Sequence, residues 1–253
     1  MGTPENGAVK SAVRFRWPAA VILAIGLLAS PATASAATGI VHGPLRSISN
    51  GTSSNWSGYA AHGATFNSVS ASWVQPAGQC TNKATWSAFW VGLDGYTSRT
   101  VEQTGSEVDC SGGSPVYYAW YEMYPANSVN FSNPVAAGDH FTASVTASGS
   151  NFTLTITDTT QGWHRAITKS LSSAQKSSAE VIAEAPCCTA SGGILPLTDF
   201  GTVHFTNAMA NGSVIGNSSP TKINMRPIGG GTNTANTSSL SGGENFHVTW
   251  AGN

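Results

Sequence analysis

Charged side chains are scarce in this chain of 253 residues, where Asp, Glu, Lys and Arg together make up 9%. The net charge of −1 is too small to indicate nucleic acid or an anionic membrane as a partner. The sequence has no internal repeat, and only residues 171–176 weakly resemble a helix. Ser, Thr, Asn and Gly take the place of the missing charges.

The shortage of charge bears on behaviour in acid. After removal of residues 1–36, interpreted below as a signal peptide, the chain keeps eight Lys and Arg residues against eleven acidic ones, a net charge of −3. Acid unfolding follows mainly from protonation of paired carboxylates and from repulsion among the remaining cations. A chain with few of either has less to lose in acid, although secreted Ser- and Thr-rich β proteins share this composition.

The first 36 residues are typical of a signal peptide. Lys10, Arg14 and Arg16 precede an apolar run from Ala19 to Leu28, which is too short to span a bilayer. Ala34-Ser35-Ala36 then offers an A-x-A cleavage site. We expect a secreted, extracellular, soluble protein with no membrane contact after cleavage, in which residues 37–54 form a short flexible segment before a single domain at 55–253.

Cysteine is also rare, with only Cys80, Cys110, Cys187 and Cys188. The spacing excludes a zinc framework built from paired C-x-x-C motifs. In an oxidising compartment a Cys80–Cys110 disulfide is the favoured pairing. Cys187 and Cys188 are left to form a ring between neighbours, to stay as thiols, or to pair with the other two.

The dominant pattern is an alternation of apolar and polar residues with period two. It is clear at residues 68–73, 141–146 and 152–156, and it predicts strands with one dry face. About a dozen such strands in some 200 residues predict an all-β fold, an antiparallel β-sandwich of two large sheets of the jelly-roll, concanavalin A-like type. Residues 228–243, rich in Gly, Thr, Asn and Ser, are expected to form a flexible loop.

Strand alternation also assigns side chains to faces. Trp120, Glu122 and Tyr124 share one face of a strand, and Glu180 and Glu184 share one face of another. The small apolar residues of both strands would face the core, which leaves the carboxylates and aromatics on an outer, concave face. Ordinary solvated surface explains any one of these glutamates taken alone.

Gln103 and Glu184 are polar residues inside apolar, strand-like runs, where a hydrocarbon side chain would be less costly. Peptide hydrolysis needs a base to activate water and a donor to hold the oxyanion. A glutamate, with a reference pKa of about 4.3, can accept that proton in mild acid. An amide donates at any pH, whereas a second carboxylate would share a proton with the first.

Five ordered motifs resemble the glutamic peptidase family, the eqolisins. They are Trp90-Val91-Gly92-Leu93-Asp94-Gly95, Glu102-Gln103-Thr104-Gly105, Ala119-Trp120-Tyr121-Glu122-Met123-Tyr124-Pro125, Ala179-Glu180-Val181-Ile182-Ala183-Glu184 and Asp199-Phe200-Gly201-Thr202-Val203-His204-Phe205-Thr206-Asn207-Ala208. The resemblance implies a β-sandwich acid endopeptidase that acts on polypeptide substrates with a catalytic Gln/Glu dyad. By motif match the dyad is Gln103 and Glu184, the second glutamate of its motif.

The resemblance also implies the surroundings of the dyad and the absence of a metal or organic cofactor. Trp90 would wall the site, while Asp94 and Glu122 would position or tune the dyad. Glu107 stands where fungal members commonly carry Asp, so a contact to substrate differs there. The other residues expected at the substrate are Trp120 and Tyr124. We expect a monomer. Gln103 and Glu184 should meet across a water-sized gap in an open groove.

Two other functions explain part of the pattern. A jelly-roll glycosidase would use Glu122 and Glu184 as its carboxylate pair, but it gives Gln103 no role. A non-catalytic carbohydrate-binding module would use Trp120, Tyr121 and Tyr124 as a stacking platform around Glu122. It likewise leaves the amide unexplained.

Overall fold

The computed structural model describes residues 1–2, 40–49, 51–187 and 193–252. Contacts divide the chain into residues 1–34 and 35–253, and the fold below concerns the second unit. The predicted signal peptide therefore lies almost entirely outside the described residues. In the described part of the chain, the helical structure is too short to span a membrane.

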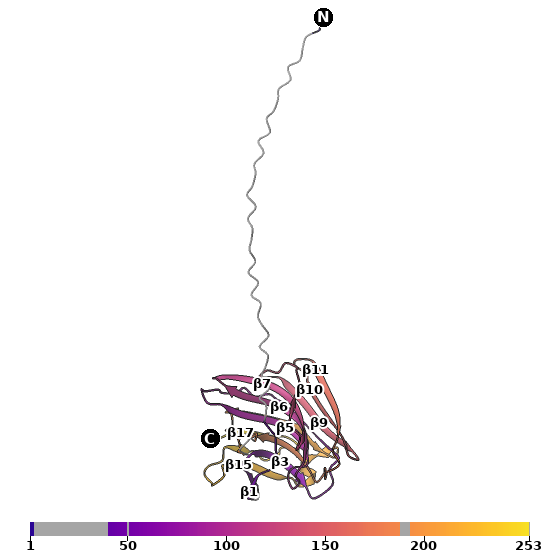
Figure 1. Cartoon of the computed structure of the whole chain (residues 1–253), viewed down its shortest axis with the longest axis vertical. Coiled ribbons are helices and arrows are strands. Elements are labelled where there is room, and N and C mark those ends of the chain that lie inside the picture. Colours follow the sequence, from indigo (N-terminus) through magenta and orange to yellow (C-terminus); the bar gives the residue numbers. More distant parts are fainter. Residues whose placement is uncertain (3–39, 50, 188–192, 253) are drawn as a thin grey trace. The chain divides into compact units, whose positions relative to one another are not determined.

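One of the two sheets, here called the front sheet, is antiparallel throughout. Figure 1 shows its strands β5, β6 and β7 side by side. In spatial order the front sheet contains β15 (Thr221–Met225), β3 (Trp56–His62), β12 (Ser178–Glu184), β5 (Thr85–Leu93), β6 (Val101–Ser111), β7 (Ser114–Tyr124) and β8 (Val129–Asn130).

The back sheet packs against the front sheet and is antiparallel except where β15 meets β2. In spatial order it contains β11 (Trp163–Ser170), β10 (Asn151–Asp158), β9 (His140–Ser148), β4 (Ser68–Val74), β13 (Thr202–Ala210), β17 (Phe246–Trp250), β16 (Ala235–Thr237), β15, β2 (Thr52–Ser53) and β1 (Ser47–Ser49). β14 (Ser213–Val214) also pairs with β13.

Strand β15 joins the two sheets. Its first residues, Thr221–Ile223, pair with β3 in the front sheet. Asn224 and Met225 pair with β2 in the back sheet, and Met225 also pairs with β16. The result confirms the all-β, two-sheet sandwich predicted from the period-two pattern.

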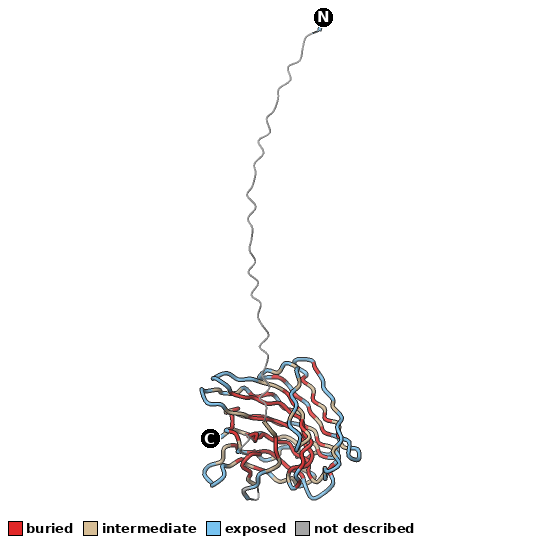
Figure 2. Tube along the Cα trace, in the orientation of Figure 1, coloured by how far each residue is buried: buried red, intermediate tan, exposed pale blue. Residues whose placement is uncertain are grey.

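The main core lies between the sheets and is built from the dry faces of the alternating strands. Phe89, Val91 and Val181 of the front sheet pack in the same cluster as Trp73 and Phe141 of the back sheet. Figure 2 shows the buried residues concentrated along the strands, with the exposed ones at turns and edges. This is the arrangement that the alternation predicts.

A second apolar cluster covers the opposite face of the front sheet. It contains Trp56, Trp90, Trp120 and Ile182, each fully buried. We expected this face to be an outer, exposed one. It is instead covered in part by the chain that precedes β1, and the central strands β3, β12, β5 and β6 are buried on both faces over most of their length.

Two regions differ in local detail from the sequence-based expectations. Residues 228–243 contain β16, which pairs with β15 and β17, so this stretch is not wholly a loop. Residues 171–176 have no helix, and the helical structure in the described residues is one 3-10 turn at Ile215–Ser218.

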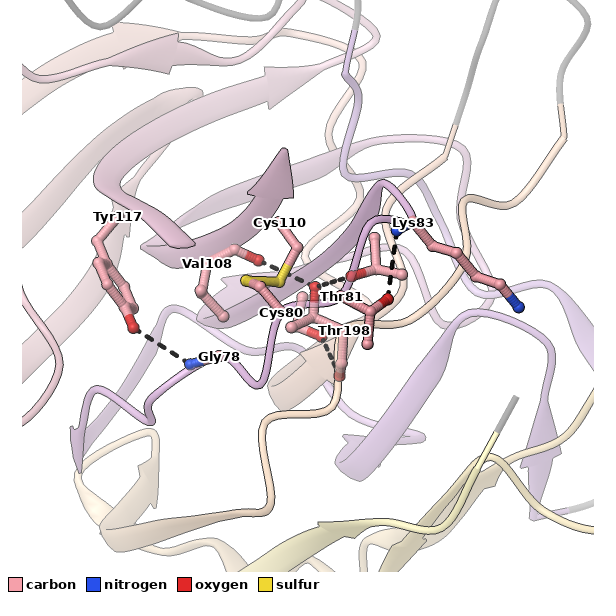
Figure 3. The surroundings of a disulfide bond; sticks show 10 residues. Gly78, Cys80, Thr81, Lys83, Val108, Cys110, Tyr117 and Thr198 are labelled. Carbon is pink, nitrogen blue, oxygen red and sulfur yellow. Dashed lines mark hydrogen bonds between the residues drawn. A yellow bond between two sulfur atoms is a disulfide. The ribbon is translucent and has the colours of Figure 1, made fainter. Parts of the chain in front are cut away.

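The favoured disulfide pairing is confirmed. Cys80, in the loop before β5, is bonded to Cys110 near the end of β6, with a Cα–Cα distance of 5.3 Å. Figure 3 shows the bond beside Thr198 and near Gly78, whose N–H donates to the Tyr117 hydroxyl at 3.2 Å. Cys187 is also disulfide-bonded, whereas Cys188 lies outside the described residues.

Candidate active site

The covered face of the front sheet carries the residues predicted for the site. Cross-strand pairing places Gln103 of β6 between Gly92 of β5 and Glu122 of β7. Gly92 pairs on its other side with Glu180 of β12. Gln103 and Glu180 are therefore level with each other on two strands separated by β5.

Glu184 lies four residues further along β12. It pairs with Ala88 of β5, and Ala88 pairs with Glu107 of β6. Glu184 is therefore level with Glu107 rather than with Gln103. Among the described residues, no hydrogen bond joins Gln103 directly to Glu184.

Two glycines create room on this face for the large aromatic rings. A Cβ atom on Gly105 would lie 2.2 Å from the Phe89 carbonyl oxygen and 2.6 Å from the Trp90 Cβ. A Cβ atom on Gly92 would lie 2.9 Å from the Trp90 ring and 3.0 Å from the Gln103 Cβ. A larger residue at Gly92 would displace the indole or the amide, and one at Gly105 would clash with the main chain of β5, because Cβ atoms do not approach other heavy atoms so closely.

The Gln103 amide connects a carboxyl group and a peptide carbonyl. Its Nε2 donates to Glu122 Oε2 at 3.2 Å and to the backbone oxygen of His42. Its Oε1 accepts no hydrogen bond from the described residues. Gln103 and Glu122 are both fully buried. Gln103 thus holds a peptide carbonyl, which is the interaction expected of an oxyanion donor.

Each carboxyl oxygen of Glu184 has its own donor. Trp90 Nε1 donates to Oε2 at 2.8 Å, and Asn55 Nδ2 donates to Oε1 at 3.3 Å. Trp90 is fixed in turn by a T-shaped contact with Trp56, at 5.0 Å between ring centroids. Glu184 is therefore held in one orientation by the aromatic cluster.

Burial changes the acidity of this group of carboxyls. It raises the pKa of Glu184 well above its usual range, helped by the negative charge of Glu122, while the Trp90 hydrogen bond works in the opposite direction. Burial likewise raises the pKa of Glu122, against the lowering effect of His42. It raises the pKa of Glu107 to about 7, although the Asp109 and Tyr118 hydrogen bonds lower it. Burial therefore favours the protonated form of each of these carboxyls.

His42, which the sequence did not single out, lies at the centre of the site. Its Nε2 is 2.7 Å from Glu107 Oε2, and its Nδ1 is 3.2 Å from Glu122 Oε2. Its backbone N–H donates to the same Glu122 oxygen at 2.9 Å. The ring stacks on Trp120, with centroids 3.6 Å apart and an interplanar angle of 3°.

The residues after His42 continue across the face. The Gly43 carbonyl accepts from Trp56 Nε1 at 3.1 Å, and the Pro44 carbonyl accepts from Asn55 Nδ2 at 3.2 Å. Leu45 N–H donates to the Gly95 carbonyl at 3.0 Å. Within the segment 37–54, residues 40–45 are buried or half-buried, whereas Arg46, Ser47 and Ser49 are exposed. We call residues 40–45 the covering segment.

Asp94 and Tyr124 lie at the margin of the site. The Asp94 carboxylate accepts backbone N–H groups from Gln175, Lys176 and Ser177 at 2.7–2.8 Å, so it anchors the chain that enters β12. Tyr124, at the end of β7, is partly buried against the aromatic cluster. In the described part of the chain, neither forms a hydrogen bond with Gln103 or Glu184. Trp90 bonds to Glu184 and Glu122 bonds to Gln103, while Glu107 and Trp120 both contact His42.

The sequence did not predict the contributions of Asn55 and Trp56. Both are fully buried; Asn55 directly precedes β3, and Trp56 is its first residue and pairs with Glu184 of β12. The sequence held one indication of a buried polar site here, because an Asn-Trp pair at the start of an apolar strand is costly to bury without polar partners. Asp109, whose Oδ2 accepts from the Tyr118 hydroxyl at 2.8 Å, extends the acid cluster.

An open pocket of about 320 Å³ begins beside the covered site. Ser54 and Ala185 line it, and they adjoin Asn55 and Glu184 in sequence. The rest of its lining is largely apolar: Ile194, Leu195, Pro196, Leu197, Met225, Pro227, Ile228 and Thr234.

Solved structures share this architecture. The structure of scytalido-glutamic peptidase with a transition state analog inhibitor superposes with a TM-score of 0.68 and 25% identity, over 78% of this chain and 98% of that one. Aspergilloglutamic peptidase from Aspergillus niger matches with a TM-score of 0.58 and 30% identity, over 66% of this chain and 99% of that one.

Two relatives found by sequence match shorter parts of the chain. Scytalidopepsin B from Scytalidium lignicola is 40% identical over 97 residues, or 38% of this chain and 36% of that protein. Aspergillopepsin-2 from Aspergillus niger is 32% identical over 150 residues, or 55% and 52%. The matches span about a third and about half of those relatives. The profile of the Peptidase A4 family covers residues 54–250, so the resemblance to glutamic peptidases is confirmed and the chain belongs to that family.

Proposed function

We propose that this protein is a secreted acid endopeptidase that hydrolyses peptide bonds of polypeptide substrates. Glu184 is its general base and acid, and Gln103 is its oxyanion donor. The protein works as an extracellular monomer without a metal, an organic cofactor or a nucleic-acid partner. Family membership supports the reaction class, and the solved relative with a peptide-based transition state analog supports a polypeptide substrate.

One observation carries the assignment of Gln103. Its Nε2 donates to the main-chain carbonyl of His42 inside a buried, aromatic-lined site. The same N–H would donate to the carbonyl oxygen of a substrate and, more strongly, to the oxyanion that forms from it. An amide keeps this role in acid because it does not titrate there.

Glu184 would carry the proton in both steps. As a carboxylate it takes a proton from water while the water oxygen attacks the carbonyl carbon. It then returns that proton to the nitrogen of the leaving amine as the C–N bond breaks. Its fixed orientation between Trp90 and Asn55 supports this role, because a positioned base avoids the entropic cost of finding its substrate.

Glu122 and Glu107 would tune the site rather than do chemistry. Glu122 binds the donor Gln103 and raises the pKa of Glu184. In the glycosidase alternative Glu122 would be a catalytic acid, which leaves its bond to an amide unexplained. The carbohydrate-binding alternative gives Gln103 and its hydrogen bond to Glu122 no role.

Digestion of an unfolded protein at about pH 3–5, the range of a glutamate base, tests the assignment. We expect Glu184→Gln to lower kcat by about 100-fold or more and Gln103→Ala by about 100–1000-fold. Both variants should retain the native circular dichroism spectrum.

Glu180→Gln is the matched control, because Glu180 is on the same strand and face, is equally buried, and is level with Gln103. It should keep most of the activity. If Glu180→Gln were inactive while Glu184→Gln digested the substrate normally, the base would have to be reassigned to Glu180. Undiminished digestion by either Glu184→Gln or Gln103→Ala would end the dyad hypothesis.

A further inference from the structure

The covering segment lies where the proposed function needs substrate to lie. Gln103 Nε2, the donor assigned to the substrate carbonyl, is bonded to the His42 carbonyl. Trp56 Nε1 and Asn55 Nδ2, beside Glu184, donate to the next two carbonyls, those of Gly43 and Pro44. Three successive peptide carbonyls of one strand-like segment thus use donors around the proposed dyad.

The segment is also held at both ends. Upstream, Val41 N–H donates to the Cys187 carbonyl at 2.6 Å, just beyond β12, and the Ile40 carbonyl accepts from the Ser128 hydroxyl at 3.2 Å. Downstream, Leu45 bonds to Gly95 and Arg46 N–H donates to Asn55 Oδ1 at 2.9 Å. Main-chain bonds of this kind do not depend on sequence, and they are how an extended peptide binds a cleft.

His42 supplies the contacts that are specific to this sequence. Its ring fills the space over Trp120, and its two nitrogens lie against Glu107 and Glu122. Burying these two carboxyls without a hydrogen-bond partner would be costly, so the His42 ring stabilises them in the covered site. Asp109 also interacts electrostatically with His42. Glu184 and Tyr118 interact with the two carboxyls that His42 contacts, Glu184 with both and Tyr118 with Glu107.

Substrate and covering segment cannot occupy the site together. A substrate carbonyl at Gln103 would require the His42 carbonyl to leave, and access to Glu184 would require the segment to move, since both dyad residues have no exposed surface. The raised pKa of the covered Glu184 points the same way, because a carboxyl that keeps its proton in acid cannot act as a base.

We propose that residues 40–45 are a tethered peptide ligand of this chain's own substrate cleft, that they compete with substrate, and that His42 is their anchor. This inference rests on the proposed function of the same site. If the leader is removed after Ala36, three residues precede Ile40, so the blocking segment would remain on the mature chain.

The test measures kcat and KM of the full mature chain and of His42→Ala on a quenched-fluorescence peptide. Loss of the anchor should lower KM by about tenfold or more, equivalent to about 1.4 kcal/mol, and leave kcat unchanged. His62→Ala is the matched control, because His62 is an exposed histidine bonded to Thr221, and its KM should match the parent. Mass spectrometry confirms that residues 40–45 are still present in each preparation.

Gly43→Val provides a second, independent way to displace the segment. A Cβ atom at Gly43 would already lie 3.2 Å from the Cys187 Sγ, so a branched side chain should push the segment out. The same fall in KM is expected. If His42→Ala and Gly43→Val both fold and keep the parent KM, or if kcat falls with KM unchanged, the segment does not compete with substrate and the inference is wrong.

Adding the segment in trans separates this inference from the proposed function. An acetylated Ile-Val-His-Gly-Pro-Leu amide should inhibit His42→Ala competitively, and the same peptide with Ala for His should inhibit about tenfold less strongly. Equal inhibition by the two peptides would overturn the role of His42. If no variant digests any substrate but the labelled peptide still binds His42→Ala, the endopeptidase assignment fails while the binding of the segment stands.

Discussion

Trp90 is the residue that couples the aromatic cluster to the carboxyl chemistry. Its ring lies over Gly92 and against Trp56, while its N–H reaches Glu184 Oε2. An indole that is fixed on three sides holds the carboxyl with little loss of entropy on binding. The packing of the aromatic cluster therefore also sets the position of the proposed base, Glu184.

Trp90→Phe should keep an aromatic ring at this position, with a smaller contact area, and remove the N–H. The Trp90 hydrogen bond lowers the pKa of Glu184, so its loss should raise that pKa. A bond worth about 1 kcal/mol would move the acid limb of the kcat/KM profile up by about 0.5–1 pH unit. The measurement is a pH profile of peptide cleavage from pH 2 to pH 6.

Trp73→Phe is the matched control for this experiment. Trp73 Nε1 donates to Ser106 Oγ at 2.8 Å in the main core, on the other face of the sheet. The substitution should cost comparable stability but leave the pH profile in place. Equal shifts in the two variants would mean that the profile reports folding rather than the base.

For single residues, the sequence predicts which face of a strand a side chain occupies better than it predicts which residues that side chain contacts. Alternation along β7 and β12 correctly grouped Trp120 with Glu122 and Glu180 with Glu184, because successive strand residues must point in opposite directions. His42 could not be found this way. It reaches Glu122 across 80 positions of sequence, from a segment with no periodicity to reveal its contacts.

Among the elements, strand β12 depends on how its start is held. Asp94, at φ 69°, turns the chain out of β5 and accepts three backbone N–H groups from residues 175–177. These residues lead directly into β12 at Ser178. The loop after β5 therefore fixes the element that carries Glu180 and Glu184.

Asp94→Asn should weaken this junction without strain in the backbone, since Asn tolerates positive φ. One amide oxygen cannot replace two carboxylate oxygens, so the free energy of unfolding should fall by about 1–3 kcal/mol. Urea unfolding at pH 5 measures it. Asp199→Asn is the control, because Asp199 caps one N–H, that of Gly201, in an exposed turn, and it should change stability by less than about 0.5 kcal/mol.

The Cys80–Cys110 disulfide ties the loop before β5 to the end of β6. It joins residues 30 positions apart, and closing a loop of that length removes entropy from the unfolded chain worth about 3–4 kcal/mol. The double variant Cys80→Ala/Cys110→Ala should unfold at a lower urea concentration by a corresponding amount. An unchanged midpoint would show that neighbouring contacts, such as Thr198 to Thr85 at 2.9 Å, already fix this corner.

The sequence could not predict the register between neighbouring strands. Period two fixes which residues share a face, but any even shift between β12 and β6 preserves that pattern. The structure places Gln103 level with Glu180, and Glu184 level with Glu107. The family motifs, not the alternation, distinguish the two glutamates, and this is why the control variant at Glu180 matters.

In the whole molecule, most of the few carboxyl groups are buried. Burial raises the pKa of Glu102 to about 9, that of Asp109 to about 10 and that of Glu107 to about 7. In the unfolded chain such groups titrate near pH 4. Between these values the folded chain binds more protons than the unfolded chain, so its stability is greatest in acid and falls as pH rises.

Urea midpoints at pH 5 and pH 8 should therefore differ, with the lower midpoint at pH 8. Each such proton contributes up to about 1.4 kcal/mol per pH unit. Glu102→Gln removes one of them without changing the shape of the side chain, so it should flatten the pH dependence and stabilise the protein at pH 8. A midpoint that rises from pH 5 to pH 8 would contradict the assignment of these shifts.

The two-sheet sandwich was predictable because alternation forces each strand to bury one face, and a single sheet of this length would curl or split. The covering of the front sheet was not. Apolar residues such as Trp56, Trp90 and Ile182 occupy its second face, yet by pattern they are indistinguishable from a solvent-exposed binding face. Only the position of residues 40–45 decides between the two.

The burial of Asn55 has a consequence for producing the protein. Asn55-Trp56-Ser57 has the N-x-S/T sequence that glycosylating hosts modify. The side-chain nitrogen that would carry a sugar donates instead to Glu184 and to Pro44 and has no room around it. A glycan attached there before folding would prevent closure of the site, whereas one on the exposed Asn151 of β10 would be harmless. Expression in yeast or insect cells should therefore yield a misfolded fraction that Ser57→Ala removes.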